Sequence, residues 1–320
     1  MRRKKYVLLI TVLLIIGLIT SCNMKKKSNG QVKPADNASE QSAELKKNEA
    51  EKVMVNYKAL LLQNKEPFEI VKFIDENIAK VDQNDAVNMI EEFLNVQEKF
   101  IQGYTDEISK DDRQSLIFKV CSEPEFDFKK INEIKDEELK NLLTKIIDGK
   151  YKLVNIEGSC YPIIDYEAIG KYNKYLTDEM KGYIDIKAKE SNEPSMMDAA
   201  LVISWDELAN RMLGVEKYLV KYPEGIKEEE LTRLYGNYLV VYLSGTDNSP
   251  IYNYETKKIF DDVLSSYKKL VATNKGTITG DTVKKYIELI ANNKNIIDEN
   301  VTSKIIELHN EAIARIEEHK

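Results

Sequence analysis

Histidine is nearly absent from this sequence, which contains only His309 and His319. They lie ten positions apart, outside the i, i+4 spacing that places two histidines on one metal ion. The chain also contains no GxSxG, P-loop, GxGxxG or HExxH string. The sequence therefore predicts no metal site and no cofactor, and it disfavours a serine or cysteine nucleophile that depends on histidine.

Glycine and proline are also scarce, with 13 and 7 residues in a chain of 320. Hydrophobic residues make up 42% of the chain, enough for a sizeable core, and charged residues make up 32%. Few turn formers combined with many Leu, Ile, Glu and Lys favour helices over a turn-rich β fold. We expect an all-α protein, either a helical bundle or an irregular helical array.

The chain also lacks a net positive charge: its formal net charge is −7. A protein that binds nucleic acid usually carries clustered Lys and Arg to neutralise phosphates. The composition therefore argues against a nucleic-acid partner and is compatible with a protein or cell-envelope partner.

The N-terminus has the pattern of an export signal. Four cations, Arg2 to Lys5, precede the apolar run of residues 6–19, and Ile19-Thr20-Ser21-Cys22 follows. These last four residues resemble the lipobox of bacterial lipoproteins. The resemblance implies cleavage after Ser21, lipidation of Cys22, and a lipid-anchored protein on the extracytoplasmic face of the cell membrane.

Two other interpretations of the N-terminus are less favoured. A transmembrane anchor needs about 20 apolar residues, and this run is shorter. A buried N-terminal helix in a cytosolic protein would not need the clustered cations. Loss of residues 1–21 would remove four positive charges and lower the formal net charge from −7 to −11.

The remaining sequence divides into three segments. Residues 22–42 have almost no large apolar side chain and are expected to form a disordered tether. Helical periodicity then predicts an N-terminal helical domain at 43–150, with one helix stopping at Gly103 and another capped by Asp136. Residues 151–165 resemble a short β-hairpin that opens a C-terminal helical domain at 151–320. In that domain, Ser204 and Glu207 match a capping box.

Two cysteines remain besides Cys22. In an exported chain Cys121 and Cys160 can form a disulfide, or both can be buried thiols. The sequence leaves both possibilities open.

Tyrosines at helical spacing are the most distinctive pattern in the C-terminal half. Tyr235, Tyr238 and Tyr242 are spaced by three and four residues, and Tyr172 lies upstream of them. Such rings suit a half-buried groove or a partner surface, or they are simply part of the core. We consider these four tyrosines and Trp205 as candidate binding residues.

Carboxylates next to aromatic residues suggest a different site. Asp165, Asp206 and Glu207 have Tyr161, Tyr166 and Trp205 as sequence neighbours, as in a glycosidase cleft. The same three carboxylates are also placed to cap helices. The sequence thus favours a non-enzymatic binding or scaffold lipoprotein. The alternatives are a carboxylate-dependent cell-wall hydrolase and a transporter's solute-binding lipoprotein, although the latter would need repeated strand–helix alternation.

The lipoprotein interpretation predicts the behaviour of one variant. Cys22→Ala should abolish lipidation and leave the protein either uncleaved or released from the membrane, because two acyl chains are what holds it there. Mass spectrometry of membrane-extracted protein tests this, and an unmodified Cys22 in the wild-type protein would contradict it.

Overall fold

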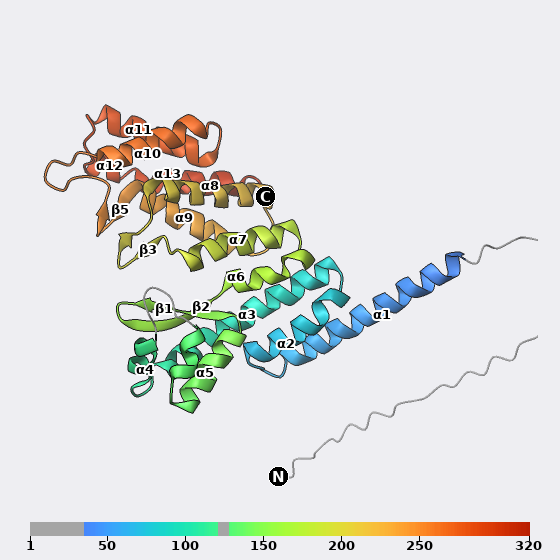
Figure 1. Ribbon diagram of the computed structural model, residues 1–320. Helices are drawn as coiled ribbons and strands as arrows, with labels where there is room; N and C mark the ends of the chain where they lie inside the picture. Colours follow the sequence, from blue (N-terminus) through green and yellow to red (C-terminus); the bar gives the residue numbers. More distant parts are fainter. Residues whose placement is uncertain (1–34, 121–127) are drawn as a thin grey trace, which may run out of the picture. The chain divides into compact units, whose positions relative to one another are not determined.

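The computed structural model describes residues 35–120 and 128–320, and these residues are mostly helical (Figure 1). The α-helices are α1 (Ala35–Leu61), α2 (Pro67–Asn77), α3 (Gln83–Ile108), α4 (Arg113–Val120), α5 (Glu137–Asp148), α6 (Tyr166–Ile169), α7 (Asp178–Asn192), α8 (Trp205–Lys221), α9 (Glu228–Ser244), α10 (Asp261–Thr273), α11 (Ile278–Asn292), α12 (Glu299–Thr302) and α13 (Ile305–Glu317). Short 3-10 helices are η1 (Ile78–Lys80), η2 (Phe128–Glu133) and η3 (Gly170–Tyr175). The prediction of an all-α protein is confirmed.

The β structure of the described ranges is confined to three two-stranded antiparallel sheets and two isolated bridges. The strands are β1 (Tyr151–Ile156), β2 (Ser159–Ile164), β3 (Met196–Met197), β4 (Ala200–Leu201), β5 (Gly245–Thr246) and β6 (Ser249–Pro250). The pair β1–β2 is the predicted hairpin, with Tyr151 opposite Ile164 and Ile156 opposite Ser159. The pairs β3–β4 and β5–β6 are additional hairpins that the sequence did not indicate.

Local sequence signals place several helix ends correctly. The side chain of Asp136 accepts hydrogen bonds from the backbone of Glu138 and Leu139 and so caps α5, as expected. Ser204 Oγ likewise accepts from Glu207 N at the start of α8. A capping box also requires the Glu207 carboxylate to accept from the Ser204 backbone amide. This part of the prediction is wrong, because the carboxylate pairs with Lys189 and Arg211.

The predicted end of a helix at Gly103 is also wrong, since α3 continues through it to Ile108. A glycine inside a helix costs only about 1 kcal/mol relative to alanine. Tyr104 and Ile108 lie beyond the glycine and are buried in the core. Their packing offsets that cost.

The structure describes only some of the segments that the sequence predicts. The signal segment and residues 22–34 of the proposed tether lie outside the described residues, whereas residues 35–42 belong to α1. Residues 45–320 form one compact unit. Hydrogen bonds such as Tyr172 Oη to Asp75 Oδ1 (2.8 Å) cross residue 151. The division into domains at 43–150 and 151–320 stays a prediction.

The helices of the C-terminal half pack around α8. Helix α9 lies against α8, α10 and α11 pack on each other and on α8, and α13 contacts α9 and α11. Figure 1 shows α13 beside α8 and α9. Leu208, Met212, Val215 and Leu219 give α8 the apolar face that this packing buries.

One cation interrupts that apolar face. Arg211 is only 5% exposed, and its guanidinium donates to Glu190 Oε1 (2.6 Å), the Glu193 carbonyl (2.6 Å), a Glu193 carboxylate oxygen (2.7 Å) and Glu207 Oε1 (3.2 Å). Glu190 lies in the last turns of α7, and Glu193 is its C-cap. We call these four residues the Arg211 cluster, and they join the end of α7 to α8.

Removal of this cation should be costly. Arg211→Ala leaves three carboxylates without their shared partner, so we expect the free energy of unfolding to fall by about 3 kcal/mol in chemical denaturation. The matched control is Arg233→Ala, whose side chain is 69% exposed and lies 4.0 Å from Glu229. This control should cost less than about 1 kcal/mol, and equal losses in the two variants would contradict a structural role for the cluster.

Candidate functional site

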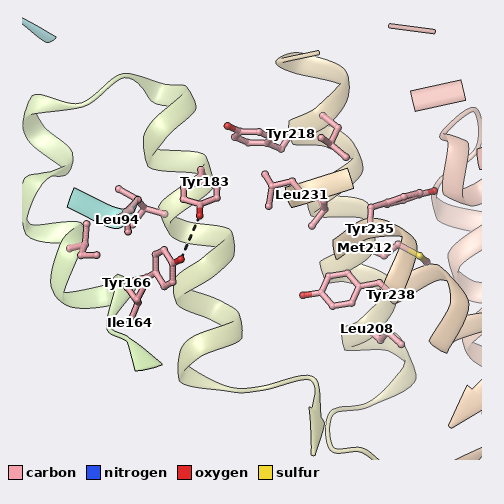
Figure 2. Close-up of a cluster of buried hydrophobic side chains, with 14 of the residues drawn as sticks. Leu94, Ile164, Tyr166, Tyr183, Leu208, Met212, Tyr218, Leu231, Tyr235 and Tyr238 are labelled. Atoms are coloured by element: carbon pink, nitrogen blue, oxygen red, sulfur yellow. Dashed lines mark hydrogen bonds between the residues drawn. The ribbon is translucent and has the colours of Figure 1, made fainter. Parts of the chain in front are cut away.

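The tyrosines proposed as binding residues lie in the core. Tyr235 and Tyr242 are fully buried, and Tyr238 and Tyr172 are at most 4% exposed. Figure 2 shows Tyr235 and Tyr238 of α9 beside Met212 and Leu208 of α8. The interpretation of these rings as a contact groove is therefore wrong, and the stripe is a packing face.

Their hydroxyl groups form hydrogen bonds inside the protein. Tyr235 Oη lies 3.1 Å from Thr279 Oγ1, and Tyr242 Oη lies 2.8 Å from Ser266 Oγ. Burial raises the pKa of both phenols above the ordinary value. These tyrosines therefore stay neutral and specify which helices face each other.

Trp205 differs from the tyrosines because it is only partly buried. Its ring packs against Tyr242, with 6.2 Å between the centroids. Trp205 begins α8 directly after the β3–β4 hairpin, so it lies at the edge of the core near an exposed segment.

The three carboxylates considered for a hydrolase have separate structural roles. Asp165 Oδ1 accepts from Ala168 N and caps α6. Hydrogen bonds from Lys269 and from Lys189 hold the pKa values of Asp206 and Glu207, respectively, below the ordinary carboxyl range. A general acid in a glycosidase needs a raised pKa, so this arrangement does not favour a catalytic pair.

Of the two cysteines of the predicted disulfide, the structure describes only Cys160. Cys160 is buried in β2, and its backbone amide donates to Gln114 Oε1 at 2.8 Å. Cys121 lies outside the described residues, as does Cys22. The Cys121–Cys160 disulfide stays a prediction.

An exposed apolar strip on the β3–β4 hairpin is the strongest candidate for a contact site. Met196 and Met197 are each 42% exposed and Val202 is 51% exposed. Because side chains alternate along a strand, Met197, Ala200 and Val202 share one face, whereas Leu201 faces the core. Met196 pairs with Leu201 and lies on the opposite face. We call Met197 and Val202 the hairpin surface.

The turn of this hairpin has an unusual backbone. Asp198 and Ala199 both have positive φ angles, of 47° and 51°, as a type I′ turn requires. The left-handed region costs a residue such as alanine about 1 kcal/mol. Strain of this kind persists only where neighbouring groups determine the conformation.

The β5–β6 hairpin provides those neighbouring groups. Asn248 donates from its backbone N to Ala199 O (3.0 Å) and from Nδ2 to Asp198 O (2.6 Å). Leu201 N donates to Ser249 Oγ at 3.0 Å. Figure 1 shows the two hairpins next to each other. The second hairpin therefore fixes the turn of the first.

The base of the hairpin is fixed to the Arg211 cluster. Glu190 uses Oε1 for Arg211, and its Oε2 accepts from Ser195 Oγ (3.1 Å) and Ser195 N (3.4 Å). Ser195 O then accepts from Val202 N at 3.0 Å. A continuous chain of hydrogen bonds thus connects the buried cation on α8 to the hairpin surface.

Neither the β3–β4 hairpin nor the Arg211 cluster was predicted from the sequence. The consecutive methionines at 196 and 197 lie beside a stretch that looked like a polar break. One signal was available for Arg211, because it shares the helical face of Leu208 and Val215. A charged residue on an apolar helix face indicates a buried ion pair.

Within residues 35–120 and 128–320, no group of three or more His, Cys, Asp or Glu side chains is placed to hold a metal ion. In the same ranges, no helix combines the length and the apolar character that crossing a bilayer requires.

Comparisons with known proteins found no counterpart. No protein-family model, curated protein or solved structure matches this chain.

The packing role of the tyrosine stripe predicts how its variants behave. Tyr242→Phe removes the buried hydrogen bond between Tyr242 Oη and Ser266 Oγ and should lower the free energy of unfolding by about 1 kcal/mol. Tyr242→Ala should cost about 3 kcal/mol or more through the cavity it creates. Thermal unfolding measures both, and unchanged stability in Tyr242→Ala would contradict the buried position.

Proposed function

We propose that this protein is a lipid-anchored extracytoplasmic lipoprotein that acts as a non-enzymatic binding or scaffold module. Its hairpin surface would contact a protein partner in the cell envelope. The observation that carries the proposal is the exposed face of Met197 and Val202 on a hairpin fixed to the Arg211 cluster.

The chemistry of this surface suits protein recognition. Methionine is flexible and polarisable and adapts to irregular apolar surfaces. The backbone beneath it is fixed by hydrogen bonds at both the turn and the base. A fixed backbone lowers the entropy that binding must overcome, because only the side chains become ordered.

The anchor proposal rests on the sequence alone. A diacylglyceryl group on Cys22 would supply two acyl chains, enough for stable membrane residence without further protein contacts. Residues 22–34, together with the start of α1, would separate the folded part from the bilayer.

The two alternative functions receive less support from the geometry. A carboxylate-dependent hydrolase would need converging carboxylates, whereas Asp206 and Glu207 pair with different cations. A solute-binding lipoprotein with two α/β lobes would need larger sheets than the two-stranded ones in the described residues.

Charge substitutions on the hairpin surface test the proposal. A partner is first identified by photo-crosslinking in cells, with the crosslinker placed at position 197. Met197→Glu and Val202→Glu should then each weaken the affinity of the purified partner at least tenfold, because an apolar contact is replaced by a desolvated charge. Both side chains are exposed, so thermal stability should remain unchanged.

The matched control is Ile306→Glu on α13, where an isolated apolar side chain is 69% exposed. This variant carries the same change of charge and should bind the partner as the wild type does. Equal weakening by Ile306→Glu, or unchanged binding by Met197→Glu, would overturn the assignment of the hairpin surface.

A further inference from the structure

A second surface of the C-terminal half has a different chemistry. A groove of about 860 Å³ lies between α8, the start of α11 and the end of α13. Its apolar lining includes Leu213, Val220 and Ile278, and Val220 is 37% exposed. The groove does not include the hairpin surface.

Cations surround this apolar lining. Lys217 and Lys221 lie on α8 and Arg315 on α13. Lys217 is exposed, and the Lys221 ammonium lies 4.9 Å from the Tyr222 ring centroid. Within the described residues, neither lysine has a carboxylate in ion-pair distance, whereas Arg315 pairs with Asp281 at 3.0 Å.

Two carboxylates also line the groove. Glu216 is 5% exposed, and its two oxygens accept from Ile278 N (2.7 Å) and Thr279 N (2.8 Å) at the start of α11. The amides of a helix N-terminus carry partial positive charge, which balances this carboxylate. Glu318 is then the one other carboxylate that lines the groove.

Two lysines without an ion-pair partner among the described residues, beside an apolar floor, are complementary to an amphipathic anion. Pockets for small molecules combine apolar walls with a few polar groups that fix the orientation of the ligand. We propose that the groove between α8 and α13 binds a small amphipathic anion, with its acidic group at Lys217 and Lys221 and its apolar part against Val220 and Leu213.

The probe for this site is 8-anilinonaphthalene-1-sulfonate, which combines an apolar ring system with a sulfonate. We expect one molecule to bind per protein, with increased fluorescence. Octanoate should displace it, whereas acetate and octylammonium should not at equal ionic strength. Displacement by octylammonium as well would show apolar binding without charge recognition and would overturn the proposal.

Variants locate the probe on the protein. Lys217→Glu combined with Lys221→Glu should weaken binding at least tenfold, and Val220→Ser should weaken it about threefold. The matched control is Lys268→Glu combined with Lys284→Glu, which makes the same change of net charge at exposed positions outside the groove. Equal weakening by this control would show a long-range charge effect and would contradict the site.

A further variant separates this site from the proposed protein-contact surface. Met197→Glu should leave binding of the sulfonate probe unchanged. If Met197→Glu abolishes binding and the lysine variants do not, the probe occupies the hairpin surface and the groove proposal fails.

Discussion

The buried guanidinium of Arg211 is the constraint on which the C-terminal half depends. A cation with 5% exposure must recover its lost hydration from protein acceptors. Its acceptors come from the end of α7 and from α8 itself, so the observed packing of α7 against α8 is one that satisfies the charge. The same carboxylate of Glu190 then binds Ser195, which places the hairpin surface relative to α8.

Tyrosine hydroxyl groups impose a similar constraint on the other helices. Tyr57 of α1 donates to the Met89 carbonyl of α3, and Tyr235 and Tyr242 of α9 pair with α11 and α10. A buried hydroxyl without a partner costs about 1–3 kcal/mol. A shifted helix packing would break these pairs, so the tyrosines favour the observed arrangement.

The sequence predicted the features that depend on local chemistry. Helical periodicity and the caps at Asp136 and Ser204 were right, because caps satisfy backbone amides within three residues. The hairpin at residues 151–164 was found because its six-residue strands are long enough to show a pattern. The two-residue strands at 196–201 are too short, and Asp198-Ala199 lacks the Asn-Gly signal of a type I′ turn.

The hairpin surface and the burial of the tyrosines depend on tertiary contacts, so local sequence patterns could not predict them. A tyrosine stripe looks alike in a core and in a groove, because the residue has both an apolar ring and a polar hydroxyl. Only the exposure of the rings distinguishes the two cases, and Tyr235, Tyr238 and Tyr242 are buried. The hairpin surface is likewise defined by contacts between distant residues, such as Asn248 with Asp198.

The Arg211 cluster holds the hairpin surface in place through Glu190 and Ser195. Hydrogen exchange of the Glu190→Gln variant measures this effect, because the substitution weakens the connection between Arg211 and Ser195. We predict faster exchange at the amides of Leu201 and Val202 and unchanged exchange at Leu239 in α9. Unchanged exchange at Leu201 and Val202, or equally faster exchange at Leu239, would show that the Arg211 cluster does not hold the hairpin.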